Sequence, residues 1–472
     1  MSFASYPFLL VALPAALIVY YALARRGRRA QNAWLLIASL AMYGYANLIY
    51  LPILIGSIAI NYAFARAIPS RPAASRRLYA WGAAWNLALL GFFKYYGFFA
   101  DRLAPALAGD VTLTKLVLPL GISFYTIRQI LLLRDVRAGD ARVGGFLEYA
   151  LFVSCFPAVA SGPIARYGDL APQFADAERG KPDFDRIARG IYGFGIGLFK
   201  KAVIADTLAP FADAAFGAGV LPLPAGWLAM IAYAMQIYFD FSGYADMALG
   251  IGGMLGLDLP RNFDAPYRSA SISEFWRRWH ITLGAALRDL VYIPLGGNRK
   301  GRLREAANLW ITFLLSGIWH GATLPFAVWG ALHGAFAAVE RALREPIERI
   351  PRALRVAGTF LLVSALWIPF RAETLSDALD LFRSLVNFKD LSFRAVGTLA
   401  MDGIADFSYV ANALYASALV CALAIHARYG ADSSERVRRF CPNRRSMAAA
   451  TLYFIIAIVH LSREGAFIYF GF

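Results

Sequence analysis

The run Gly226-Trp-Leu-Ala-Met-Ile-Ala-Tyr-Ala-Met-Gln-Ile-Tyr-Phe239 contains no charged side chain. Comparable charge-free runs lie at residues 51–65, 149–163, 356–370 and 447–461. Apolar residues make up 59% of the 472-residue chain, charged residues make up 17%, and the mean hydropathy is +0.51. Because about 20 helical residues cross a bilayer core, these runs predict an all-α polytopic membrane protein with about 11 or 12 transmembrane or partly inserted helices.

The distribution of positive charge predicts how the chain is oriented. Lys and Arg number 47 against 31 Asp and Glu, a net charge of +16. Arginines follow the first apolar run at residues 25–29 and the third at residues 66–77, whereas the turn between the second and third runs is uncharged. Cytoplasmic loops are enriched in Lys and Arg, so we expect the N-terminus outside and these loops in the cytoplasm. Nucleic-acid binding is disfavoured, because the charge flanks apolar segments and no soluble basic module is present.

Several common kinds of site have no counterpart in the sequence. The three cysteines form no CxxC pair, and no cluster has the spacing of metal ligands. We therefore predict neither disulfides nor a metal site. The sequence also contains no Gly-rich phosphate loop and no serine-hydrolase elbow.

Prolines, glycines and hydroxyl groups interrupt two of the apolar segments. They occur in Leu118-Pro-Leu-Gly-Ile-Ser-Phe-Tyr-Thr126 and Phe156-Pro-Ala-Val-Ala-Ser-Gly-Pro163. Such interruptions are tolerated at membrane depth only where protein or a water-filled cavity satisfies the freed backbone groups. The pattern predicts kinked or re-entrant helices packed around a central cavity.

A second irregular region covers residues 257–300. It begins with a turn-rich stretch containing two prolines, after which Ser271 and Glu274 have the spacing of a capping box. We expect the helix that follows to run from Phe275 to about Leu290. Its aromatic and basic faces are typical of a helix in the membrane interface.

Two histidines in this chain share an aromatic setting. The segments are Ser271-Ile-Ser-Glu-Phe-Trp-Arg-Arg-Trp-His280 and Ser316-Gly-Ile-Trp-His-Gly321, so that Trp279 and Trp319 each precede a histidine. The chain has only five histidines, and imidazole is the side chain that exchanges protons near neutral pH. An ionisable residue at membrane depth is a functional candidate by default.

His320 is the stronger candidate, as a general base that removes a proton from an acceptor hydroxyl while the hydroxyl attacks an activated acyl group. A packed histidine bonded to a backbone carbonyl is the alternative. Gly317 and Gly321 favour the functional interpretation, because small residues allow another backbone or a substrate to approach closely. His280 could stabilise the acyl carbonyl, bind the donor, or be a polar residue of an interfacial helix. His333 is expected to be structural rather than a partner of His320.

Other buried polar residues are candidates for lining a cavity or for structural networks. Gln236 and Asp240 share a helix face, whereas Asp246 lies on a different face. A buried carboxylate must be paired or protonated, and Arg277, Arg278 and Arg288 are plausible partners. Arg128 lies in an apolar stretch, where a cation either pairs with a carboxylate or faces an aqueous pocket.

Taken together, seven segments in this order resemble the membrane-bound O-acyltransferase family, in its bacterial branch typified by the alginate O-acetyltransferase membrane subunit. They are Leu118-Pro-Leu-Gly-Ile-Ser-Phe-Tyr-Thr126, Gly162-Pro163, Gln236-Ile-Tyr-Phe-Asp-Phe-Ser-Gly-Tyr244, Asn262-Phe263, Glu274-Phe-Trp-Arg-Arg-Trp-His280, Tyr292-Ile-Pro-Leu-Gly-Gly297 and Gly317-Ile-Trp-His-Gly321. The resemblance covers nearly the whole chain, although Ile127-Arg128 departs from the pattern that usually follows the first segment.

The resemblance implies a single membrane domain over residues 1–472. N-terminal helices would occupy residues 1–100, a catalytic core residues 116–345, and C-terminal helices residues 346–472. It implies a funnelled helical bundle in the bacterial inner membrane, with His320 at the catalytic position and His280 at a second, more variable polar position. Acetyl-CoA is the donor implied for that branch, with no tightly bound cofactor. Membrane lipids, an extracytoplasmic acceptor protein and a polysaccharide are the implied partners; the oligomeric state is not indicated.

Other functions compete with acetyl transfer to an exported polysaccharide. D-alanyl transfer to a cell-wall polymer, or acylation of a lipid or peptide, would use the same histidines with a different donor or acceptor. A transporter or an assembly scaffold would also use broken helices and buried polar residues. No inverted repeat is visible, however, and the paired Trp-His segments have no obvious role in transport.

Overall fold

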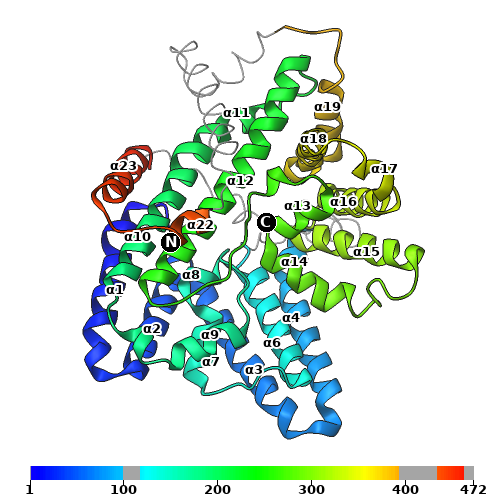
Figure 1. Ribbon diagram of the computed structural model, residues 1–472. Helices are drawn as coiled ribbons and strands as arrows, with labels where there is room; N and C mark the ends of the chain where they lie inside the picture. Colours follow the sequence, from blue (N-terminus) through cyan, green and yellow to red (C-terminus); the bar gives the residue numbers. More distant parts are fainter. Residues whose placement is uncertain (1, 99–116, 393–432, 462–472) are drawn as a thin grey trace, which may run out of the picture. The chain divides into compact units, whose positions relative to one another are not determined.

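The computed structural model describes residues 2–98, 117–392 and 433–461, and Figure 1 shows their arrangement as helices. In these three ranges the regular structure is helical throughout and no strand occurs. This result confirms the prediction of an all-α protein.

The chain forms two compact units. The first comprises residues 1–197, 244–261 and 437–454, and the second comprises residues 198–243, 262–436 and 455–472, as far as each is described. Helix α12, Leu223–Met254, is common to both, since its first two thirds lie in the second unit and its end lies in the first.

The first unit also contains α1 (Leu13–Ala22), α2 (Arg28–Ala46), α3 (Leu51–Ser70), α4 (Ser75–Phe98), α6 (Ile122–Ala138), α7 (Phe146–Ser154), α8 (Phe156–Val159), α9 (Tyr167–Ala175), α10 (Phe184–Phe199) and most of α23 (Arg444–His460). The second unit contains α11 (Asp206–Phe216), α13 (Ile272–Arg278), α14 (Ile281–Leu287), α15 (Arg302–His320), α16 (Leu324–Ala342), α17 (Arg344–Glu348), α18 (Arg352–Arg371), α19 (Leu375–Ser384) and most of α22 (Ser433–Arg438).

Within the described residues, three helical stretches are long and apolar enough to cross a membrane. They are Phe8–Arg26, Leu48–Ser70 and Arg352–Arg371. The second and third contain charge-free runs recognised in the sequence. The larger number of spanning or partly inserted helices, and the funnel they would form, stay predictions.

Buried amides tie the helices of the first unit together. The side chains of Asn61 on α3 and Asn86 on α4 bond to each other, with nitrogen–oxygen distances of 3.2 and 2.6 Å. Gln129 on α6 donates to Ser57 and accepts from the Tyr149 hydroxyl of α7 at 3.1 Å. Hydrogen bonds of this kind link helices where apolar surroundings offer no water to compete. This cluster therefore fixes how α3, α4, α6 and α7 pack.

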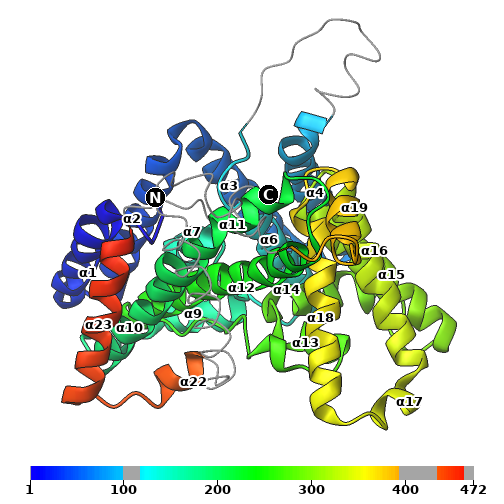
Figure 2. The ribbon, with the colours of Figure 1, turned by 90° about the horizontal axis from the view of Figure 1, so that it is seen from above.

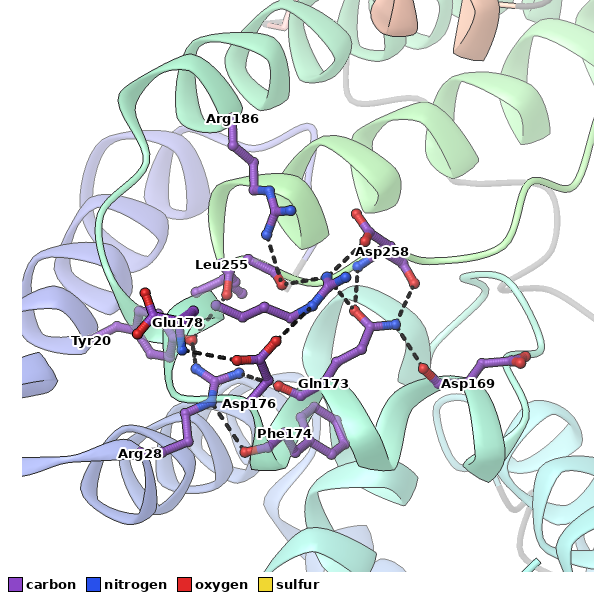
Figure 3. Close-up of polar contacts among 12 residues, drawn as sticks. Tyr20, Arg28, Asp169, Gln173, Phe174, Asp176, Glu178, Arg186, Leu255 and Asp258 are labelled. Atoms are coloured by element: carbon purple, nitrogen blue, oxygen red, sulfur yellow. Dashed lines mark hydrogen bonds and ion pairs between the residues drawn. The ribbon is translucent and has the colours of Figure 1, made fainter.

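A second polar network of the first unit holds the C-terminal end of α12 (Figure 3). The Tyr20 hydroxyl of α1 donates to the carbonyl of Leu255 at 2.9 Å, and both Arg179 and Arg186 donate to the carbonyl of Gly256. Arg179 also forms an ion pair with Asp258, with 2.7 Å between nitrogen and oxygen. The carbonyls of the turn after α12 have no partner within the helix, so these donors stabilise the turn in which α12 ends.

The predicted interruptions in helices are confirmed in the first unit. A buried, non-helical stretch follows α8, and Gly121, the residue before α6, is in a left-handed conformation with φ +69°. A Cβ atom on Gly121 would lie 2.1 Å from the carbonyl oxygen of Val159. The two interrupted segments therefore pack backbone against backbone, which requires glycine at position 121.

The prediction of one helix from Phe275 to about Leu290 was wrong. Helix α13 begins at Ile272 and ends at Arg278, and α14 begins only at Ile281, after His280 in a left-handed conformation. The N-cap is confirmed, because the Ser271 hydroxyl accepts from the amide of Glu274 at 3.0 Å. The Glu274 carboxylate bonds the amide of Ala270 instead of completing the capping box with Ser271.

We expect Gly121→Ala to destabilise the protein more than Gly139→Ala. Both glycines are left-handed, one at each end of α6, but Gly139 has open space around it. The alanine at 139 should lower the free energy of unfolding by about 1 to 2 kcal/mol from backbone strain alone. The alanine at 121 adds a backbone clash and should cost at least about 2 kcal/mol more. Thermal unfolding in detergent measures both, and equal midpoints would contradict the close packing.

Candidate functional site

A continuous aromatic cluster in the second unit joins the two histidine segments. The ring centroids of Trp279 and Trp367 lie 4.9 Å apart, and those of Trp367 and Trp329 lie 5.7 Å apart. The Trp329 ring in turn contacts the His320 ring at 5.3 Å. The tryptophans come from the segment after α13, from α18 and from α16. Three segments distant in sequence therefore contribute to one apolar wall beside His320.

His320 is the last residue of α15 and is 3% exposed. Its imidazole also contacts the rings of Trp319 at 4.8 Å and Phe370 at 5.2 Å. Because aromatic side chains surround it, the ring is held in one orientation and shielded from bulk solvent. A buried histidine at a helix end is a geometry in which proton transfer to a bound group is feasible.

The glycines beside His320 allow α16 to approach α15 closely, and these two helices lie side by side in Figures 1 and 2. A Cβ atom on Gly317 would lie 2.2 Å from the carbonyl oxygen of Phe326, and one on Gly321 would lie 2.1 Å from the Phe326 ring. The expected close approach of another backbone is therefore confirmed, and the approaching backbone is that of α16.

His280 occupies a strained backbone conformation between two short helices. Its φ and ψ are 44° and 52°, in the left-handed region that side-chain-bearing residues rarely adopt. Asn262 bonds to the two residues that follow His280. Its backbone carbonyl accepts from the amide of Ile281 at 3.0 Å, and its Oδ1 accepts from the Thr282 amide and hydroxyl at 3.2 and 2.6 Å. Strain of this kind persists only where the surroundings enforce it, and it concentrates at functional sites.

The His280 side chain lies in apolar surroundings and is 2% exposed. Its ring meets the Phe241 ring edge-on, with 4.8 Å between centroids. Burial lowers the pKa of His280 to about 3, because the charged imidazolium loses its hydration. The ring is therefore neutral near pH 7, and a neutral imidazole has one donor and one acceptor nitrogen.

The partner of Asp240 differs from the expected one. Nζ of Lys201 lies 2.8 Å from Oδ1 of Asp240 and 2.6 Å from Oδ1 of Asp206, and all three side chains are at most 10% exposed. Of the expected arginines, Arg278 pairs with Glu274, Arg288 pairs with Asp289, and Arg277 is exposed. Lys201 lies in a π-helical turn, Lys200–Ala205, directly before α11.

The remaining candidates divide between the two units. Gln236 is buried one turn before Asp240 on α12, and Asp246 is buried on the part of α12 that belongs to the first unit. Arg128 of the first unit is fully buried, donates to the carbonyl of Phe152 and stacks 4.7 Å from that ring. Among the described residues Arg128 pairs with no carboxylate, and its Nε and Nη1 make no hydrogen bond there. The aqueous pocket that the sequence offers as the alternative stays a prediction.

Sequence reasoning missed three contributors to this region. Lys201 could have been noticed from the sequence, because it is one of three cations in the otherwise apolar stretch Ile187–Ala205. Asn262 was recognised only through the family resemblance, and its contacts across the helix break required the structure. Trp367 carries no local signal, because its role depends on α18 packing beside Trp329. Within the described residues no group of three His, Cys, Asp or Glu could hold a metal ion.

We expect Lys201→Met to destabilise the protein by about 3 kcal/mol or more, since the change leaves two buried carboxylates without this cation. The matched control is Lys181→Met, which removes an exposed pair with Glu178 and should cost less than about 1 kcal/mol. Thermal unfolding in detergent compares the two. Similar midpoints for both variants would show that the buried triad contributes little.

Comparison with known proteins places these features in a family. The model of the membrane-bound O-acyltransferase family matches residues 110–356, a range that includes both His280 and His320. A peptidoglycan O-acetyltransferase of Helicobacter pylori is 38% identical, with 82% of this chain and 80% of the relative covered. A probable alginate O-acetylase AlgI of Pseudomonas aeruginosa is 40% identical, with 82% of this chain and 75% of the relative covered.

More distant relatives transfer a different group. A teichoic acid D-alanyltransferase of Streptococcus thermophilus is 27% identical, with 58% of this chain and 68% of the relative covered. The family model covers more than half of the chain, and the O-acetyltransferases match across most of it. This chain therefore belongs to the membrane-bound O-acyltransferase family and is a membrane O-acyltransferase of that type.

Proposed function

We propose that this enzyme transfers an acetyl group to hydroxyl groups of an exported or cell-surface polysaccharide, with His320 as general base. The observation that carries the proposal is the setting of His320, a buried imidazole at the end of α15 inside an aromatic wall. The named activities of relatives that are 38% and 40% identical support acetyl as the group and a polysaccharide as the acceptor.

In this mechanism the imidazole of His320 accepts the proton of an acceptor hydroxyl. The hydroxyl oxygen forms a bond to the carbonyl carbon of an acetyl thioester, and the carbon–sulfur bond breaks as the tetrahedral intermediate collapses. The proton held by His320 then passes to the departing thiolate, so that an ester and a thiol are formed. A positioned general base of this kind contributes roughly 10²- to 10⁴-fold to the rate.

His280 is assigned to the carbonyl side of the reaction. A neutral imidazole carries one N–H donor, and hydrogen-bond donors aimed at the developing oxyanion stabilise the transition state. The strained backbone held by Asn262 would give that donor a fixed direction. His280 and neighbouring polar groups would therefore stabilise the charge that His320 helps to create.

Acetyl-CoA in the cytosol is the proposed donor, and no residue of the chain is assigned to bind it. We place the acceptor on the outer side of the bacterial inner membrane. There an extracytoplasmic acceptor protein would deliver the acetyl group to the polysaccharide. The enzyme would then pass the acetyl group across the membrane, with its N-terminus outside and its basic loops inside. Membrane lipids surround the protein in this arrangement.

We expect His320→Ala to lower O-acetylation of surface polysaccharide roughly a hundredfold or more at matched membrane abundance, because the general base is lost. His460→Ala is the matched control, since His460 lies on α23 and its ring bonds to the carbonyl of Ile456 at 2.8 Å. The measurement is the alkali-released acetate of the purified polysaccharide and of peptidoglycan from the same cells.

Unchanged acetate in the His320→Ala cells would contradict the assignment of His320. If acetate is also unchanged when the gene is deleted, the acetyl assignment itself fails, and D-alanyl ester content becomes the quantity to measure, because D-alanyltransferases are among the relatives. A loss of acetate with the control variant alone would point to an unexpected role of α23.

The orientation is tested by labelling of cysteines. Cys441 is exposed and lies in a basic segment expected in the cytoplasm, while Cys155 is buried. With Cys421, which lies outside the described residues, changed to serine, a membrane-impermeant maleimide should label Cys441 only after spheroplasts are permeabilised. Leu48→Cys, in the exposed turn before α3, should be labelled from outside. The reverse pattern would place the N-terminus in the cytoplasm.

A further inference from the structure

One face of α16 contacts both segments that contain the candidate histidines, within the second unit. Trp329 and His333 are four residues apart, and Glu340 follows seven residues after His333, so the three side chains lie along one side of the helix. Trp329 packs against the ring of His320 at 5.3 Å. The other two residues contact α13, the helix that leads to His280.

The contacts between α16 and α13 occur at two levels. At the beginning of α13, the carboxylate of Glu340 accepts hydrogen bonds from the backbone amides of Ile272 and Ser273, the latter at 3.2 Å. One turn later, Nε1 of Trp276 donates to Nδ1 of His333 at 3.2 Å. Three residues after Trp276 the chain reaches Trp279, and then His280.

The hydrogen bond from Trp276 determines which ring nitrogen of His333 carries the proton. An indole nitrogen can only donate, so Nδ1 of His333 must accept and the proton of the neutral ring must be on Nε2. His333 is fully buried, and the rings of Trp276, Trp329 and Trp367 surround it at 5.0 to 6.1 Å. These aromatic contacts fill the volume around the His333 ring, and the hydrogen bond from Trp276 fixes the orientation of the ring.

We propose that His333 is a positioning residue that sets His280 and His320 relative to each other. Its hydrogen bond from Trp276 holds α13 in register on α16, while Trp329 on the same face of α16 holds the His320 ring. The proposal rests on the function proposed above, in which both histidines act on one acyl group. His333 itself does not touch the reacting atoms.

A packing role alone makes a different prediction. If His333 only filled space among the tryptophans, phenylalanine would replace it without loss, and glutamine, which lacks a ring, would be the worse substitute. If the hydrogen bond matters, His333→Phe should be defective, whereas His333→Gln, whose amide oxygen can accept from the indole, should recover part of the function.

The first readout is independent of any acyl transfer. Hydrogen exchange of the purified full-length protein in detergent is followed in peptides covering residues 272–284, which include the break at His280. His333→Phe and Trp276→Phe should each speed exchange there by roughly three- to tenfold, the range for losing one buried hydrogen bond. The double variant should match either single variant, because both remove the same interaction.

The second readout is the acetate content of the polysaccharide at matched membrane abundance. It should fall by roughly three- to tenfold in both single variants, fall no further in the double variant, and recover partly in His333→Gln. Trp34→Phe is the control, since it removes a comparable indole bond, to the carbonyl of Ala16 at 3.0 Å, in the first unit. It should leave acetate and the exchange of residues 272–284 unchanged.

The outcomes separate the two proposals. Unchanged exchange in His333→Phe, additive effects in the double variant, or a more severe defect in His333→Gln than in His333→Phe would each overturn the positioning role. A different outcome would combine faster exchange in the purified variants, without additivity, with cellular acetate that does not depend on His320. That outcome would keep the link between α13 and α16 and contradict the proposed function.

Discussion

The structure depends on hydrogen bonds and ion pairs between buried polar groups, because an apolar helical protein offers such groups few other partners. The amides of Asn61 and Asn86 bond to each other, and the carbonyls after α12 accept from Tyr20 and Arg179. Lys201 lies between two buried carboxylates. Each polar group that lacks a partner in such surroundings costs several kcal/mol. These buried contacts therefore fix one helix against another.

The same constraint is met at His280, where the predicted helix is broken. A left-handed residue between α13 and α14 frees backbone amides, and Asn262 accepts from those of Ile281 and Thr282. At the other histidine, Gly317 and Gly321 bring α16 close enough for Trp329 to reach the His320 ring. One histidine is therefore fixed through its backbone and the other through its side-chain packing. Both arrangements favour a single orientation, which acyl transfer by a general base requires.

Much of this was readable from the sequence. Charge-free runs predicted the helical class, prolines and glycines predicted the interruptions, and the ordered motifs indicated the family that the comparisons confirm. The continuous helix after Ser271 was mispredicted because helical spacing persists through Trp279 while the backbone turns at His280. The pairing of Asp240 with Lys201 instead of an arginine joins residues 39 positions apart, so it depends on how the helices pack and carries no local sequence pattern. Long-range contacts such as Trp276 to His333 join residues 57 positions apart, and they follow from packing alone.

The most direct test of the central claim is transfer by the purified enzyme in proteoliposomes. Labelled acetyl-CoA is supplied on the face that carries Cys441, and the polysaccharide is supplied on the opposite face with a periplasmic extract that contains the acceptor protein. Ester-linked label on the polysaccharide is counted over time. The account predicts that wild-type protein places alkali-labile label on the polysaccharide and that His320→Ala does so at a hundredth of that rate or less, as expected for loss of a general base. Equal transfer by the two proteins would contradict it.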